Sequence, residues 1–91
     1  MSDQTEEESL LIYARVPGGS TPPLLMNPPP DWTVKFFTKL GQHSLQVRLP
    51  GTVSAYRSSD GSLLAPDAKL GDLGLLRYEM IEFRADDSAR G

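Results

Sequence analysis

The stretch DWTVKFFTKLG, residues 31–41, decides the fold of this chain, because it fits either a strand or a helix. As a strand, it places alternate apolar residues on one face and its two lysines on the other. As a helix, it gathers Phe36, Phe37 and Leu40 on one side. The first arrangement leads to an all-β protein and the second to an α+β protein.

Local propensity and capping oppose each other in this stretch. Its tryptophan, threonines, valine and phenylalanines together cost about 3 kcal/mol in a helix relative to alanine. Asp31 would return about 1 kcal/mol as an N-cap, and Gly41 suits the position that follows a helix. Each buried apolar side chain adds roughly 1.5–3 kcal/mol, although a strand would bury some of them too.

Residues 43–49, HSLQVRL, settle the choice. Their leucines and valine alternate with polar residues, which predicts a half-buried strand. If residues 32–40 were its hairpin partner, no helix would remain to cover the sheet, and the chain would have to close into a small barrel with one proline-rich arm. We therefore predict a helix that begins at Asp31 and ends before Gly41.

Length, charge and composition exclude several classes of protein. Ninety-one residues form at most one small domain. The chain has no cysteine and one histidine, which excludes a disulfide framework and a cysteine- or histidine-based metal cluster. The net charge of −3 arises at the two ends, whereas residues 9–85 carry eight basic and six acidic side chains, or about +2. We expect a soluble, cytoplasmic monomer that binds no nucleic acid, membrane or cofactor.

The pattern along the chain predicts one folded unit between two tails. We assign residues 1–8 to a disordered acidic tail, residues 9–85 to the domain and residues 86–91 to a flexible tail. The remaining predicted elements are a strand at 10–16, an edge strand at 24–26 inside a proline-rich segment, a strand that starts near 52, a turn at 60–61, a short helical turn or packed loop at 65–76 and a final strand at 78–85.

Two segments resemble the ubiquitin-like β-grasp family. They are IYARVPGGSTPPLLM, residues 12–26, and GSLLAPDAKLGDLGLLRYEMIEF, residues 61–83. The resemblance implies an α+β fold, with a mixed four- to five-stranded sheet packed on one helix. It also implies a core that includes Ile12, Ala14, Leu64, Ile81 and Phe83. A small all-β barrel or sandwich is the alternative.

No catalytic constellation is visible in the sequence, so we do not expect an enzyme. His43 and Ser44 are adjacent, and neighbouring residues on a strand point to opposite faces. Asp60, Asp67 and Asp72 lie in ordinary turn contexts and lack the ligand density of a calcium loop.

The resemblance implies a non-conjugated, non-catalytic protein–protein interaction module. Its contact surface would be the sheet face that carries Arg15, Glu82 and Arg84, or the proline-rich loop with Trp32. Arginines on the sheet favour a partner that is acidic at its contact surface, since a guanidinium binds carboxylates in a bidentate manner.

Two other functions stay open at this level. One is a ubiquitin-like modifier or sulfur carrier that acts through the C-terminal Gly91, although ubiquitin-type modifiers end in two glycines and this chain ends in one. The other is a small all-β structural protein, for example of a phage particle.

Overall fold

The computed structural model describes residues 10–18, 21–47 and 49–86. Its elements are β1 (Ile12–Arg15), β2 (Leu24–Met26), α2 (Val34–Leu45), β3 (Thr52–Arg57), the 3-10 helix η1 (Leu70–Asp72) and β4 (Glu79–Asp86). The predicted edge strand, short helical turn and final strand are all present. The predicted tail at 1–8 and most of the tail at 86–91 lie outside the described residues, whereas the backbone of Asp86 pairs with Thr52.

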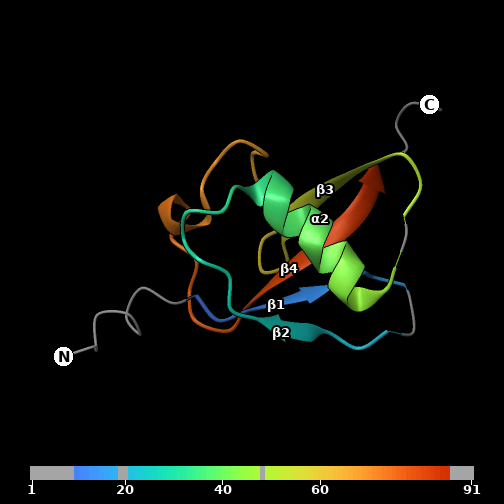
Figure 1. The fold of residues 1–91 in the computed structure, drawn as a ribbon, viewed down its shortest axis with the longest axis horizontal. Helices are drawn as coiled ribbons and strands as arrows, with labels where there is room; N and C mark the ends of the chain where they lie inside the picture. Colours follow the sequence, from blue (N-terminus) through green and yellow to red (C-terminus); the bar gives the residue numbers. More distant parts are fainter. Residues whose placement is uncertain (1–9, 19–20, 48, 87–91) are drawn as a thin grey trace.

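The strands form one mixed sheet in the order β2-β1-β4-β3. The first and last strands are parallel neighbours at its centre, and the two outer pairs are antiparallel. The helix α2 crosses one face of this sheet (Figure 1). The α+β prediction is therefore confirmed, and the all-β alternative is wrong.

The core lies between α2 and the sheet. Alternation along the central strands turns Ile12 and Ala14 of β1, and Ile81 and Phe83 of β4, toward the helix, and all four are fully buried. The ring of Phe37 on α2 meets the ring of Phe83 edge to face, with centroids 5.7 Å apart. The complete buried set is Ile12, Ala14, Val34, Phe37, Leu45, Ala55, Leu64, Leu70, Ile81 and Phe83.

The buried stripe of α2 is rotated relative to the predicted one. It consists of Val34, Phe37, Thr38, Gly41 and Leu45, which recur with the spacing of an amphipathic helix. Phe37 is buried as predicted, but Leu40 is only half-buried and Phe36 is 43% exposed. The Phe36 ring packs edge-on against Trp32 instead, at a centroid distance of 4.7 Å.

The helix begins two residues later than predicted, and its N-cap is Thr33 rather than Asp31. The Thr33 hydroxyl accepts a hydrogen bond from Phe36 N at 3.2 Å. The two amides before Phe36 are satisfied from a distant loop, because Val34 N donates to Ala68 O at 2.9 Å and Lys35 N to Pro66 O at 3.0 Å. Asp31 and Thr33 are both residue types that favour an N-cap, and the contacts with this loop select Thr33.

The predicted end at Gly41 and the predicted strand at 43–49 are both wrong. The helix continues to Leu45 and ends at Gln46, whose backbone adopts a left-handed conformation with φ of 60°. Gly41 lies inside the helix, where the absence of a side chain lets the Phe83 ring approach. Packing thus outweighs the helix-breaking tendency of a glycine.

We expect Thr33→Ala to lower the free energy of unfolding by about 1 kcal/mol, because an N-cap hydrogen bond is lost. Asp31→Ala, at the exposed position predicted from the sequence, should change it by less than about 0.5 kcal/mol. Urea unfolding followed by circular dichroism measures both values. Equal losses in the two variants would contradict the assignment of the cap to Thr33.

We also expect Gly41→Ala to destabilise the protein, although alanine is normally the better helix former. A β-carbon at this position would lie 2.5 Å from Phe83 Cε2 and 2.6 Å from Cζ. The overpacking should cost about 1–3 kcal/mol in the same urea experiment.

Two controls identify the cause of that loss. Ser44→Ala, at an exposed position of the same helix, should be neutral within about 0.5 kcal/mol. Adding Phe83→Leu to Gly41→Ala should cost less than the two single losses added together, because the smaller side chain relieves the clash. Strict additivity would show that the two residues do not compete for space.

Candidate functional site

The face of the sheet turned away from α2 carries the residues with the most interaction chemistry. Alternation places Tyr13 of β1 and Met80 of β4 on this face, and the register sets them in one row with Leu25 of β2. We call these three residues the apolar row. Leu25 is 44% exposed, and the other two are half-buried. The Tyr78 ring lies beside Tyr13, at a centroid distance of 6.4 Å.

A charged cluster occupies the next rows of the same face. It consists of Arg15 of β1, Tyr56 of β3, Ser58 in the turn after β3, and Glu82 and Arg84 of β4. The carboxylate of Glu82 is its centre. Oε1 accepts from Arg84 Nη2 at 2.8 Å and Nε at 3.2 Å, and Oε2 accepts from the Ser58 hydroxyl at 3.2 Å. Arg15 Nε lies 3.7 Å from Oε2.

The cluster buries its negative charge and presents its positive charges. The side chain of Glu82 is only 11% exposed, against 38% for Arg15 and 48% for Arg84. The hydrogen bonds from Arg84 lower the pKa of the Glu82 carboxyl, although burial alone would raise it. The sequence predicted that Glu82 faces outward, and it does lie on the outer face, but the arginines cover it.

Tyr56 gives one of these arginines a second support. The guanidinium carbon of Arg84 lies 4.7 Å from the centroid of the Tyr56 ring, within the range of a cation–π contact. Because Tyr56 and Glu82 are directly paired across β3 and β4, the ring and the carboxylate hold Arg84 from two sides. The guanidinium is therefore oriented before any partner arrives.

Of the four predicted contact residues, the structure brings three together. Arg15, Glu82 and Arg84 belong to one cluster, whereas Trp32 lies in the segment that leads into α2, which covers the other face. The Trp32 ring is half-buried and packs against Phe36. Its backbone carbonyl accepts from Leu70 N at 2.9 Å.

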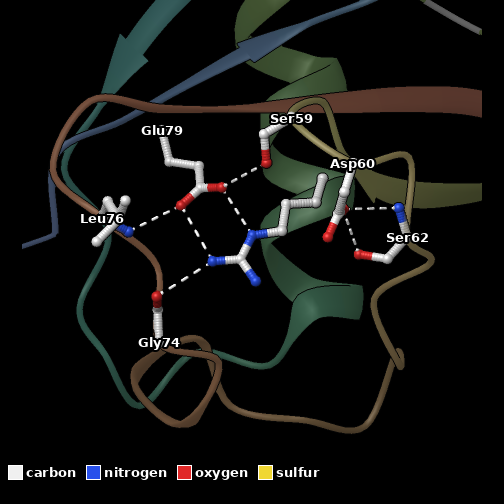
Figure 2. A network of polar contacts seen from close by, with 7 residues as sticks. Ser59, Asp60, Ser62, Gly74, Leu76 and Glu79 are labelled. Carbon is white, nitrogen blue, oxygen red and sulfur yellow. Dashed lines mark hydrogen bonds and ion pairs between the residues drawn. The ribbon is translucent and has the colours of Figure 1, made fainter.

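A separate ion pair, Arg57–Glu79, joins the end of β3 to the start of β4. Arg57 Nε donates to Glu79 Oε2 at 2.7 Å and Nη2 to Oε1 at 3.2 Å, and Nη2 also reaches Gly74 O at 3.1 Å. Glu79 accepts in addition from Leu76 N at 2.8 Å and from the Ser59 hydroxyl at 3.4 Å (Figure 2). This network ties residues 74–79 to the sheet.

Sequence reasoning missed both the apolar row and the Arg57–Glu79 pair. The first had a local signal, since the alternation that turns Ile12 and Ala14 inward turns Tyr13 outward. The second had none, because its partners are 22 residues apart and their encounter depends on the register of β3 against β4.

The residues considered for catalysis or metal binding lie on different elements of the fold. His43 and Ser44 are both exposed on α2. Asp60 Oδ1 accepts from Ser62 N and from its hydroxyl, at 3.0 and 2.8 Å, as in an ordinary Asx turn. Within residues 10–18, 21–47 and 49–86, no three histidine or carboxylate side chains gather closely enough to hold a metal ion. In the same ranges, no helix has both the length and the apolar character needed to cross a membrane.

Comparison with known proteins identifies the fold. No family model and no curated protein matches this sequence. A designed protein based on ubiquitin is 21% identical, with a TM-score of 0.69 over 92% of this chain and 96% of that chain. The ATG8 protein of Trypanosoma brucei is 16% identical, with a TM-score of 0.66 over 89% and 76%.

The same fold also occurs in an enzyme complex. A chain in the complex of toluene 4-monooxygenase with the inhibitor 4-bromobenzoate is 13% identical, with a TM-score of 0.70 over 86% of this chain and 99% of that chain. At these identities the likeness establishes the fold alone. The protein therefore has the ubiquitin-like β-grasp fold, as its sequence predicted.

The Arg57–Glu79 pair predicts a pH-dependent loss of stability. Its hydrogen bonds, those from Arg57 first, lower the pKa of the Glu79 carboxyl below the ordinary value of 4.5. A depressed pKa in the folded state stabilises the fold at neutral pH, and this contribution disappears as the pH falls below 4.5. Glu79→Gln should therefore cost about 1–2 kcal/mol at neutral pH and progressively less in acid.

Urea unfolding of the wild type and of Glu79→Gln, from neutral pH to below pH 4.5, measures the difference between their free energies of unfolding. Asp31→Asn, at an exposed carboxylate, is the control and should follow the wild type. A constant gap between Glu79→Gln and the wild type at every pH would show that the charge of Glu79 is not responsible.

Proposed function

We propose that residues 9–85 are a non-catalytic protein–protein interaction module of ubiquitin-like fold, which binds its partner through the sheet face opposite α2. One observation carries the proposal. On that face two half-exposed guanidiniums, Arg15 and Arg84, surround the buried carboxylate of Glu82. The module would act as a cytoplasmic monomer, between the tails proposed at residues 1–8 and 86–91.

The charge arrangement supports an acidic contact surface on the partner. Glu82 neutralises part of the positive charge, but it is covered, so a partner would meet the two guanidiniums first. Arg84 is already held by Glu82 and Tyr56, so binding would immobilise it at little further entropic cost. A carboxylate on the partner could then accept paired hydrogen bonds from it.

The apolar row supplies the second half of such a contact. Tyr13 and Leu25 lie next to the charged cluster, and tyrosine and arginine are both enriched in protein interfaces. Tyr78, which is 53% exposed, extends the apolar surface beyond Tyr13. An apolar centre flanked by oriented charges is a common arrangement in binding surfaces.

The proline-rich loop with Trp32 is the second contact surface predicted from the sequence. We consider this loop a weaker candidate for the contact surface than the sheet face, because the Trp32 ring already packs against Phe36. The modifier or sulfur-carrier alternative depends on Gly91, which lies outside the described residues. Mass spectrometry of the purified protein for a C-terminal adduct or thiocarboxylate tests that alternative directly.

The triple variant Arg15→Gln/Glu82→Gln/Arg84→Gln should lose its protein partners, since it removes every charge of the cluster. We expect recovery of specific partners from a lysate of the source organism to fall about tenfold, as two or three interfacial charge pairs disappear. Affinity capture with quantitative mass spectrometry measures this recovery.

Lys69→Gln is the matched control, because it changes the net charge by the same amount at an exposed position directly before η1, outside both proposed binding surfaces. Circular dichroism of both variants establishes that they are folded. Capture of the same partners at the same yield by the wild type and the triple variant would refute binding through the charged cluster.

A further inference from the structure

A groove of about 400 Å³ runs between α2 and β3, on the side of the sheet that the proposed contact face does not use. Its apolar lining includes Val34 from the helix, Val53 and Ala55 from the strand, and Leu64 from the segment beyond it. Thr38 and Gln42 of α2 also line it. The groove thus offers apolar surface along the flank of an extended strand.

The outer edge of the strand beside the groove is paired along only part of its length. β3 is the last strand of the sheet, and Ala55 O and Arg57 N bond outward, to Leu64 N at 2.9 Å and Ser62 O at 2.9 Å. Because bonding direction alternates along a strand, the N–H and C=O of Val53 also point outward. Within the described part of the chain, neither they nor the N–H of Ala55 have a hydrogen-bond partner.

Two lysines of α2 line the same groove. Lys35 and Lys39 are exposed and lie one helical turn apart. Neither forms an ion pair within the described residues. Asp67 is the carboxylate among the lining residues, so the lysines outnumber it.

We propose that this groove binds an extended peptide segment of another protein, apolar at alternate positions and acidic at its ends, which adds to β3 as a fifth strand. The peptide backbone would pair with the N–H and C=O of Val53 and with the N–H of Ala55. Alternate apolar side chains would fill the groove, and flanking carboxylates would meet Lys35 and Lys39. This surface is distinct from the open sheet face, and the inference does not rest on the function proposed for that face.

A second copy of this chain fits the groove less well than an acidic peptide. If the β3 edges of two copies paired about a two-fold axis, each copy would bring Lys35 and Lys39 to one seam. Like charges brought together in this way oppose association. A peptide with acidic ends would be attracted by the same lysines.

The test uses the synthetic peptide DEVTVTVDE, blocked at both ends, as the probe. In a titration followed by amide NMR, we expect the largest shifts at Val53, Ala55 and the first half of α2. The N–H groups of Val53 and Ala55 should become protected from hydrogen exchange. A peptide with proline in place of its central valine, DEVTPTVDE, should bind at least about tenfold more weakly, since it loses a backbone donor and an apolar side chain.

Charge reversal separates the lysines from general electrostatics. Lys35→Glu/Lys39→Glu should weaken binding of DEVTVTVDE about tenfold and improve binding of the basic peptide KKVTVTVKK. The control Lys69→Glu/Arg77→Glu makes the same net charge change at exposed positions outside the groove and should leave both affinities within about twofold.

Three results would overturn the proposal. They are no binding of the probe at millimolar concentration, binding that shifts the open sheet face instead of β3, and equal losses in both charge-reversed variants. A fourth result would also overturn it: protection of Val53 and Ala55 that grows with protein concentration in the absence of peptide would assign the edge to a second copy of this chain. Analytical ultracentrifugation at matched concentrations measures that last outcome.

Discussion

The contact between Gly41 and the ring of Phe83 sets the position of the helix on the sheet, and the rest of the structure depends on it. Since a β-carbon at position 41 would lie within 2.6 Å of this ring, only glycine allows the observed approach. Phe37 then packs edge to face against the same ring. The helix is thereby held against one face of the sheet, and the opposite face is left for other contacts.

The two covered carboxylates on β4, those of Glu79 and Glu82, have different roles in the structure. Glu79 and Glu82 both have side chains that are little exposed, and both are hydrogen-bonded by an arginine. Glu79 joins elements of the fold, because Arg57 and the backbone at Leu76 converge on it. Glu82 instead orients half-exposed arginines, which makes its surroundings the better candidate for recognition.

The groove beside β3 and the open sheet face follow from the same topology. Because β1 and β4 lie at the centre of the sheet, β3 is an outer strand with one edge free of a neighbouring strand. The groove between β3 and α2 lies beside that edge. The segment at 62–64 pairs with only part of this edge. Both proposed surfaces therefore arise from strand order, and a different order would remove them even with the same residues on each strand.

Apart from the strand wrongly predicted at 43–49, the sequence alone determined the strands and the direction of their side chains. Alternation correctly turned Ile81 and Phe83 inward and Arg84 outward, because a buried face repeats every second residue whatever its neighbours are. The same reasoning located Arg15 beside this surface. It could not reveal that Glu82 is covered, since the cover comes from side chains on other strands and from Arg84.

Only the tertiary structure decided the bounds of α2. Asp31 and Gly41 are good local signals for a helix start and end, yet the carbonyls of Pro66 and Ala68 move the start to Thr33, and Phe83 keeps Gly41 inside the helix. These contacts join residues more than 30 positions apart. A cap or a glycine is worth about 1 kcal/mol, and the burial of a helix against a sheet is worth several times that, so packing rather than local preference fixes the ends.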